Sequence, residues 1–216
     1  MTIACTIVPV TQYQQNCSVI KCETTGKGAI VDPGGDIERI MQTVEKMDVT
    51  IEKIILTHAH MDHCAASDVL RKQLKIPIEG PHRGDDYWLE GLPQACQMAG
   101  FPHADAFEPE RWLEQGDTVS VGALELAVIH CPGHTPGHIV FYYEPQQVAW
   151  VGDVIFQGSI GRTDFPGGNH DELIDSIRKK LFPLGDDITF IPGHGPTSTF
   201  GDERQTNPFV ADSRYG

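Results

Sequence analysis

The turn formed by residues 57–63 constrains this chain more than any other stretch of its sequence. It follows a short apolar run and contains His58, His60, Asp62 and His63. Because side chains alternate along an extended chain, His58 and His60 point the same way. Asp62 and His63 can turn back towards them from the start of the next helix. Four ligands from one turn are too many for a single open tetrahedral metal site, but they suit two adjacent metal ions.

Three more residues of metal-binding type follow apolar strands later in the chain. They are His134, Asp153 and His194, and each stands next to a glycine, which allows tight turns and close approach. A single His or Asp in such a place is usually a cap or turn residue. Here, however, four strand exits together deliver seven metal-type side chains. The predicted metal ligands are His58, His60, Asp62, His63, His134, Asp153 and His194.

The expected secondary structure has a similar order in the two halves of the chain. In the first half, strands are expected at residues 3–10, 17–22, 28–32, 53–56 and 77–80. Helices are expected after Asp36, which resembles an N-cap, over residues 64–75, and over residues 83–100 with a break near Pro93. In the second half, strands are expected at residues 118–121, 123–130, 138–143, 148–151 and 187–191, with a polar loop over residues 157–169 and a helix capped by Asn169.

This order of elements predicts an α+β fold in which two sheets pack together with helices outside. The chain has 216 residues and no linker or low-complexity segment, so a single domain over residues 1–216 is expected.

The formal net charge is −14, from 16 Lys and Arg against 30 Asp and Glu. This charge argues against binding nucleic acid through a basic surface and against docking on an anionic membrane. No apolar run is long enough to span a membrane, and no basic segment precedes Lys21, so neither a membrane protein nor a signal peptide is expected. We expect a cytoplasmic protein.

Six scattered cysteines contain no C-x-x-C pair, which favours reduced, mostly buried thiols. Cys64 and Cys131 adjoin the predicted metal ligands and could act as nucleophiles. A metal-activated water makes a second nucleophile unnecessary, so neither is expected to have this role. His138 stands four residues after His134 and is expected to have a buried structural role or to support a metal ligand.

The H-x-H-x-D-H motif at residues 58–63, with the later His, Asp and His, resembles the metallo-β-lactamase superfamily. The resemblance implies a four-layer αβ/βα sandwich of two mixed sheets, with the metals at one edge between the sheets. It also implies how the ligands divide: metal one takes His58, His60 and His134, metal two takes Asp62, His63 and His194, and Asp153 bridges both.

Within the superfamily the chain is similar to the glyoxalase II branch, the hydroxyacylglutathione hydrolases, in their short bacterial form. The stretches that carry this similarity are residues 31–35, 133–138, 152–156, 161–166 and 192–196. The resemblance implies cleavage of S-D-lactoylglutathione to glutathione and D-lactate by a metal-bridging hydroxide. Asp62 and Asp153 would be the catalytic carboxylates that hold the geometry and accept or steer the proton of the water.

The implied cofactors are two divalent metal ions per chain. Zinc is expected, and iron or manganese would also fit this mixed nitrogen and oxygen shell. The implied partner is a small glutathione thioester, and the protein is expected to be a monomer or a small homo-oligomer.

The longer glyoxalase II has a helical C-terminal domain that supplies basic residues for glutathione. Only residues 195–216 follow His194, so no such domain is expected here. Arg162 and Asp164 are predicted to bind substrate in its place, because an Arg can pair with a carboxylate in a fork. Asp164 could bind an ammonium group or hold Arg162. The alternative is a local surface pair between these two residues.

Other members of the same superfamily have different activities, which are alternatives for this chain. A persulfide dioxygenase would use one iron held by His58, His134 and Asp153, a facial triad with open positions. A β-lactamase is disfavoured because Asp153 stands where some of those enzymes have Cys, and a nuclease is disfavoured by the net charge. A non-catalytic metal-binding protein would tolerate loss of a ligand. All seven predicted ligands are present here, which disfavours that alternative.

Overall fold

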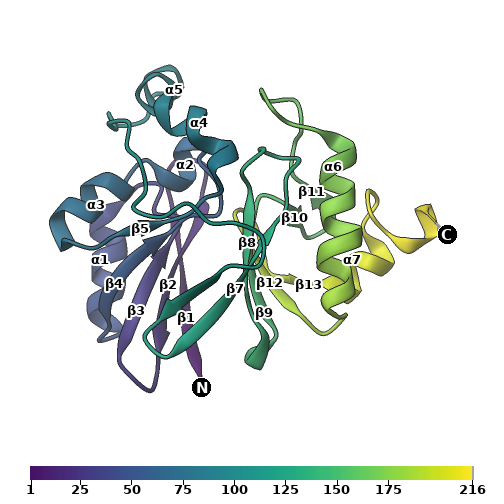
Figure 1. The fold of residues 1–216 in the computed structure, drawn as a ribbon, viewed down its shortest axis with the longest axis horizontal. Coiled ribbons are helices and arrows are strands. Elements are labelled where there is room, and N and C mark those ends of the chain that lie inside the picture. Colours follow the sequence, from purple (N-terminus) through teal and green to yellow (C-terminus); the bar gives the residue numbers. More distant parts are fainter. Residues whose placement is uncertain (216) are drawn as a thin grey trace.

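The computed structural model describes residues 1–215, and two mixed β-sheets stand side by side at its centre (Figure 1). The first sheet has the strand order β1-β2-β3-β4-β5, and its strands are β1 (Ile3–Val10), β2 (Gln15–Cys22), β3 (Lys27–Val31), β4 (Thr50–Ile55) and β5 (Ile78–Glu79). The pairs β1–β2 and β2–β3 are antiparallel, and β3–β4 and β4–β5 are parallel. Parallel neighbours need crossover connections, and the helices between these strands supply them.

The second sheet has the order β13-β12-β9-β8-β7-β6. Its strands are β6 (Thr118–Val121), β7 (Leu124–His130), β8 (Ile139–Tyr143), β9 (Val148–Gly152), β12 (Thr189–Pro192) and β13 (Ser198–Thr199). Only the β9–β12 pair of this sheet is parallel among the described residues. A separate hairpin consists of β10 (Ile155–Phe156) and β11 (Ser159–Ile160). Strands β7, β9 and β12 therefore run in one direction, and their carboxyl ends meet at one edge.

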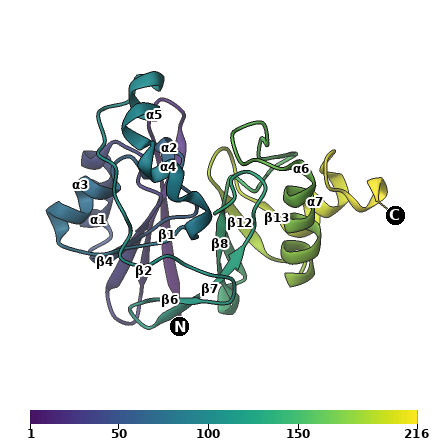
Figure 2. The same cartoon turned by 45° about the horizontal axis from the view of Figure 1, so that its top comes forward.

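Helices lie on the outer sides of both sheets (Figures 1 and 2). Those of the first half are α1 (Ile37–Lys46), α2 (Met61–Cys64), α3 (Ser67–Leu74), α4 (Asp86–Glu90) and α5 (Leu92–Ala99). Those of the second half are α6 (His170–Asp175), which continues as a π-helix over Ser176–Leu181, and α7 (Phe200–Thr206). Short 3₁₀ turns occupy Arg83–Asp85, Glu144–Gln146, Phe182–Leu184 and Asp212–Arg214. The predicted α+β sandwich of two mixed sheets with helices outside is confirmed.

Three apolar clusters fill the spaces between the layers. The first cluster packs α1 and α3 on the first sheet, through residues such as Ile40 and Leu70. The second lies between the two sheets and includes Phe141 and Trp150. The third packs α6 and its continuation on the second sheet, through residues such as Leu173. The helices α1, α3 and α6 each bury apolar residues of one face against a sheet, as amphipathic helices do.

Two of the predicted helices are interrupted. The single helix expected over residues 64–75 is in fact α2 and α3, because the chain bends at Ala65 and Ala66, where the Ala66 N–H donates to the Pro33 carbonyl at 3.0 Å. The break expected near Pro93 lies at Gly91 instead. Pro93 sits in the first turn of α5, where its missing N–H costs nothing.

Other local expectations also need correction. Asp36 precedes α1, but its carboxylate accepts the Thr11 N–H at 2.7 Å and makes no cap hydrogen bond. Asn169 does cap α6, by accepting the N–H groups of Asp171 and Glu172. The loop expected over residues 157–169 contains β11, and the strand expected at residues 187–191 is Thr189–Pro192. The sequence reading missed β13 and α7, which follow it.

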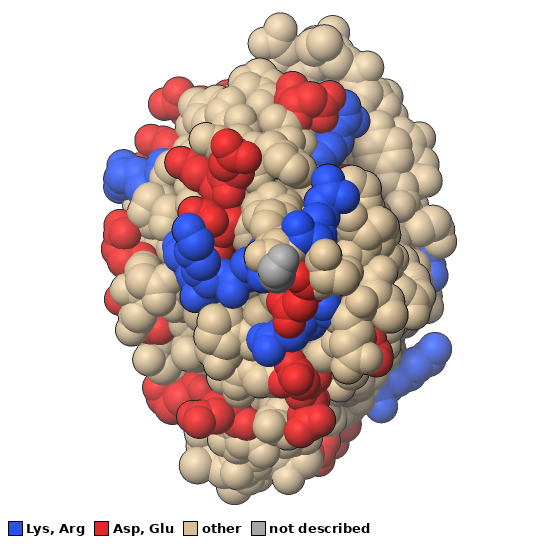
Figure 3. Space-filling view, turned by 90° about the vertical axis from the view of Figure 1, so that its right-hand side faces the viewer, with Lys and Arg blue, Asp and Glu red and all other residues tan. Residues whose placement is uncertain are grey.

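The face that carries α6 and α7 mixes basic and acidic side chains (Figure 3). Several of them pair with each other, including Arg178 with Asp212 and Lys179 with Asp175. This face therefore presents no continuous basic surface. Within residues 1–215, no helix combines the length and apolar character needed to cross a membrane.

Candidate metal centre

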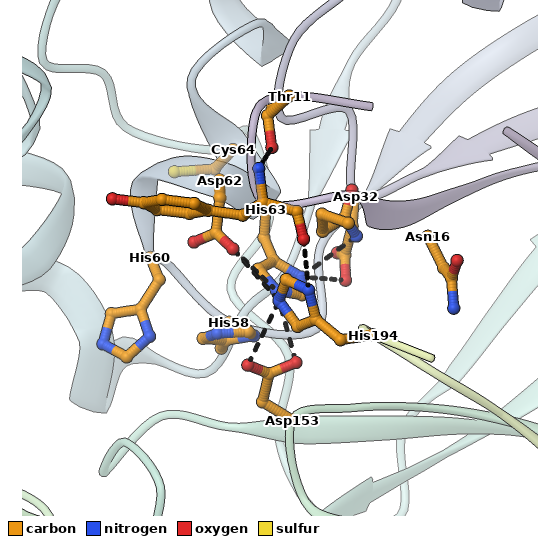
Figure 4. A network of polar contacts seen from close by, with 12 residues as sticks. Thr11, Asn16, Asp32, His58, His60, Asp62, His63, Cys64, Asp153 and His194 are labelled. Atoms are coloured by element: carbon orange, nitrogen blue, oxygen red, sulfur yellow. Dashed lines mark hydrogen bonds and ion pairs between the residues drawn. The ribbon is translucent and has the colours of Figure 1, made fainter. Parts of the chain in front are cut away.

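The seven predicted ligands come together at the edge where β4, β7, β9 and β12 end. The turn after β4 carries His58 and His60, and α2 begins at Met61, so that Asp62 and His63 turn back towards the same point (Figure 4). The exits of β7, β9 and β12 bring the remaining three from the second sheet: His134, Asp153 and His194.

Two ligand groups form within this cluster. The first ligand group is His58, His60 and His134, and the second is Asp62, His63 and His194. In each group, one nitrogen or oxygen atom per side chain lies within 4.8 Å of its counterparts. His60 Nδ1 is 3.0 Å from His134 Nε2, and Asp62 Oδ2 is 3.1 Å from His194 Nε2. Each group therefore has three donor atoms facing one small space.

Asp153 lies between the two groups. Its Oδ1 is 3.3 Å from His63 Nε2, and its Oδ2 is 3.7 Å from both His134 Nε2 and His194 Nε2. One carboxylate thus reaches both groups, which is the arrangement that a bridging ligand requires.

Hydrogen bonds on the far side of three imidazoles fix which nitrogen faces the cluster. His63 Nδ1 lies 2.9 Å from Asp32 Oδ2, His134 Nδ1 lies 2.7 Å from the Arg162 carbonyl, and His194 Nδ1 lies 3.1 Å from the Tyr13 carbonyl. An oxygen acceptor requires the proton on Nδ1, so in the neutral ring each Nε2 keeps a lone pair directed at the cluster. Metal-bound histidines commonly have this type of support.

Several buried polar atoms inside the cluster have no hydrogen-bond partner among residues 1–215. They include Nε2 of His58, Nε2 of His63 and Oδ1 of Asp153. Leaving such atoms unsatisfied costs free energy, so native proteins rarely do it without a ligand or an ion. The donor set, three imidazoles in one group and two imidazoles with a carboxylate in the other, fits divalent transition metals.

The cluster favours neutral imidazoles in the first ligand group. Burial and the nearby His63 hold the pKa of His58 well below its usual value, and burial with the adjacent His134 lowers the pKa of His60 to about 3. Neutral imidazole is the form that binds metal.

In the second ligand group, burial alone would lower the pKa of His63, but Asp153 and Asp62 outweigh it and raise that pKa. Burial would raise the pKa of Asp62 and of Asp153, yet His63 keeps both below the ordinary range. Both carboxylates are therefore ionised at neutral pH.

Two glycines leave the space that the predicted ligands Asp62 and Asp153 occupy. A Cβ on Gly34 would lie 1.5 Å from the Asp62 carbonyl oxygen, and a Cβ on Gly193 would lie 2.1 Å from Asp153 Oδ1. The Gly193 carbonyl also accepts the Asn16 N–H at 2.7 Å, which ties the exit of β12 to the first sheet. Only glycine fits at either position without moving a predicted ligand.

Asp32 and Thr57 hold two of the predicted ligands, His63 and His58, through hydrogen bonds. Asp32 accepts the Thr57 N–H at 2.7 Å, the Thr57 hydroxyl at 2.6 Å and the His63 Nδ1–H. Thr57 Oγ1 in turn lies 3.1 Å from His58 Nδ1. The sequence reading did not single out Asp32, although its place between a strand and Pro-Gly-Gly is the same kind of signal that identified the ligands.

His138 is buried beside the cluster. Its Nε2 accepts the Asp153 N–H at 3.0 Å, and its ring stacks on His58 with the centroids 4.6 Å apart. Cys64 and Cys131 are also fully buried, and burial raises the pKa of the Cys131 thiol to about 12. Such a thiol is unreactive at neutral pH, in agreement with the expectation that neither cysteine is a nucleophile.

A cleft of about 850 Å³ opens onto the cluster, with walls that are mainly apolar and include Trp88 and Phe165. Arg162 lines the cleft, whereas Asp164 pairs with Arg162 through two hydrogen bonds, Nε to Oδ1 at 2.7 Å and Nη2 to Oδ2 at 2.6 Å. The Arg162 guanidinium also lies 4.1 Å from the centre of the Phe165 ring. Of the two residues predicted to bind substrate, only Arg162 therefore faces the cleft directly.

The chain is similar in sequence to known proteins over nearly its whole length. A sequence model described as the metallo-beta-lactamase superfamily matches residues 10–194. Over 205 residues, the chain is 46% identical to the protein named hydroxyacylglutathione hydrolase GloC from Haemophilus influenzae, covering 94% of this chain and 96% of that protein.

Two solved structures are similar over nearly the whole chain. BLEG-1 B3 metallo-β-lactamase is 35% identical with a TM-score of 0.88, covering 96% of this chain and 99% of that one. TTHA1623 in a di-iron-bound form is 33% identical with a TM-score of 0.86, covering 95% of this chain and 100% of that one.

Proposed function

The chain belongs to the metallo-β-lactamase superfamily, and on that premise we propose that it is a binuclear-metal thioester hydrolase acting on S-D-lactoylglutathione. The products would be glutathione and D-lactate. The observation that carries this proposal is the presence of two complete ligand groups with Asp153 between them. The relative named as a hydroxyacylglutathione hydrolase supports the choice of substrate.

In this proposal the first ligand group would hold one ion, the second would hold another, and Asp153 lies between the two groups. When bound, two divalent ions would lower the pKa of a water molecule towards about 7 and polarise the thioester carbonyl. The metal could be zinc, iron or manganese, since all three accept imidazole and carboxylate ligands.

The protein's own groups have distinct tasks in the reaction. Asp62 and Asp153 stay ionised, so either carboxylate can accept a hydrogen bond from the attacking water and orient it. Trp88 and Phe165 narrow the cleft beside His60 and limit the access of bulk water. The glutathione thiolate is a good leaving group, so the reaction requires no strong protein acid.

Arg162 is the proposed contact for a carboxylate of glutathione. Asp164 occupies two guanidinium nitrogens, Nε and Nη2, which leaves Nη1 for the substrate. Asp164 therefore orients Arg162 in this proposal, and the stacking on Phe165 limits where the guanidinium can go.

A persulfide dioxygenase is the second candidate, since His134 and Asp153 lie close enough to share one iron with His58. A single-iron enzyme of that kind has no need of the second ligand group. The convergence of Asp62, His63 and His194 therefore favours the hydrolase.

The decisive experiment measures hydrolysis of S-D-lactoylglutathione by the purified protein, with total metal determined in the same sample. The proposal predicts turnover with about two metals per chain, lost in Asp153→Ala and retained in Asp105→Ala, a matched change at an exposed acid that does not line the cleft. No thioester turnover, one iron per chain and oxygen uptake with glutathione persulfide would replace it with the dioxygenase. Turnover of a cephalosporin alone would instead indicate a β-lactamase.

A further inference from the structure

Asp85 is a fully buried carboxylate that is not among the predicted metal ligands. It ends the 3₁₀ turn Arg83–Asp85 and immediately precedes α4. Among residues 1–215 no basic side chain forms an ion pair with it, and burial raises its pKa to about 6. An acidic side chain kept in such a place has a cost in free energy that its hydrogen bonds must offset.

The hydrogen bonds of Asp85 reach two separate ligand-bearing loops. Its Oδ2 accepts the Ala59 N–H at 3.0 Å and the Thr135 hydroxyl at 2.9 Å. Its Oδ1 accepts the Gly137 N–H at 2.6 Å. Ala59 stands between two residues of the first ligand group in the sequence, and Thr135 directly follows the third.

These two loops leave different sheets. The turn containing Ala59 follows β4 of the first sheet, and the loop containing Thr135 and Gly137 follows β7 of the second. A Cβ added to Gly137 would lie 2.4 Å from the Asp85 backbone nitrogen, so this loop packs directly on the Asp85 turn. Asp85 is thus a common acceptor for both loops that build the first ligand group.

We propose that Asp85 is a positioning residue that sets the spacing between His60 and His134 and so determines the metal affinity of the first ligand group. This inference rests on the metal site of the proposed function. The second ligand group has its own support in Asp32, which accepts a hydrogen bond from His63. Loss of Asp85 is therefore expected to weaken one metal site and spare the other.

The substitution Asp85→Asn tests the role of the charge at nearly constant volume. If the amide nitrogen replaces Oδ2, the Thr135 hydroxyl can rotate to accept from it, but the Ala59 N–H then faces another donor. If the amide nitrogen replaces Oδ1, the Gly137 N–H faces a donor instead. The first orientation removes the one bond to the Ala59 turn, and the second removes one of the two bonds to the loop that contains Thr135 and Gly137.

The experiment measures the binding of Zn²⁺ alone to metal-stripped protein, using a chelating indicator. Asp85→Asn is placed in a His194→Ala background, which leaves the first ligand group intact, and in a His134→Ala background, which leaves the second. We expect Asp85→Asn to weaken Zn²⁺ binding about 10- to 100-fold in the first background and less than about twofold in the second. Asp86→Asn, the same change at the neighbouring acid, is the matched control and should leave both affinities unchanged.

Thr135→Val provides a second variant if Asp85→Asn does not fold, since it removes one donor and keeps the other two. It should produce a smaller loss of affinity, again confined to the first ligand group. Equal loss in both backgrounds, together with a lower melting temperature of the metal-free protein, would show a merely structural role and overturn the proposal. Unchanged Zn²⁺ binding in both backgrounds would also overturn it, whereas failure of the unsubstituted protein to bind Zn²⁺, Fe²⁺ and Mn²⁺ alike would remove the proposed function itself.

Discussion

Replacing Asp32 by Asn should change which nitrogen of His63 carries the proton. In the described part of the chain, Asp32 Oδ1 accepts only the Thr57 N–H, and an amide oxygen can keep that bond. The amide nitrogen then takes the place of Oδ2, 2.9 Å from His63 Nδ1. Since an amide nitrogen is a donor, His63 Nδ1 must accept, and the ring proton moves to Nε2, the atom that faces the cluster.

The expected loss of metal affinity follows from the loss of the lone pair on His63 Nε2. Removing a partner that orients a metal-bound histidine typically weakens metal binding about 10- to 100-fold, which corresponds to about 1.4 to 2.7 kcal/mol. The loss should fall on the second ligand group. His58 Nδ1 can still donate to Thr57 Oγ1 after the substitution, so the first group should change little.

Calorimetric titration of metal-stripped protein with Zn²⁺ measures this effect, and ¹⁵N NMR of the histidine rings reports the His63 tautomer. The control is Asp36→Asn, the same change four residues later at an acid that contacts Thr11 and no predicted ligand. Wild-type affinity in Asp32→Asn, or a proton that remains on His63 Nδ1, would refute the tautomer argument.

Three further predictions concern the close packing of the centre and its buried groups. Gly193→Ala should lower both activity and metal content, because its Cβ would lie 2.1 Å from Asp153 Oδ1 and 2.6 Å from His63 Cε1. Elemental analysis and a thioester assay measure the two effects, and full metal content in the variant would contradict the prediction. Cys131→Ala should keep turnover within about twofold because the thiol is buried and protonated, its pKa being about 12, so a loss of activity without a loss of stability would point to a chemical role. In the metal-free protein, the raised pKa of Asp85 means that its carboxyl binds a proton more tightly in the folded state than in the unfolded state. The contribution of this group to the free energy of unfolding therefore grows as the pH falls through about 6. Denaturant unfolding should show that the stability of the wild type relative to Asp85→Asn is greater at pH 5 than at pH 7.5.

Local patterns in the sequence were sufficient for the layers of the fold and for the residues that converge. Strand and helix periodicity depends on neighbouring residues, so elements such as β1 and β6 match their expected bounds of residues 3–10 and 118–121. His134, Asp153 and His194 could be identified because each ends a strand, and strands of one direction end at one edge of a sheet.

The features that were missed depend on contacts that are distant in the sequence. The partners of Asp85 at Ala59, Thr135 and Gly137 are 26, 50 and 52 residues away from it. No local pattern indicates such a residue. The bend between α2 and α3 has a similar origin, because the Ala66 N–H that might continue a helix bonds instead to Pro33, on the loop after β3.

Both ligand groups draw their side chains from the two sheets. His58 and His60 follow a strand of the first sheet and His134 follows one of the second, while Asp62 and His63 face His194 in the same manner. An ion in either group would therefore join the two halves of the chain at their open edge, so metal concentration would act on folding as well as on catalysis. A free metal concentration 100-fold above the dissociation constant of one site stabilises the folded state by about 2.7 kcal/mol. Chelation would remove this contribution and leave the apolar cluster between the sheets to hold them together.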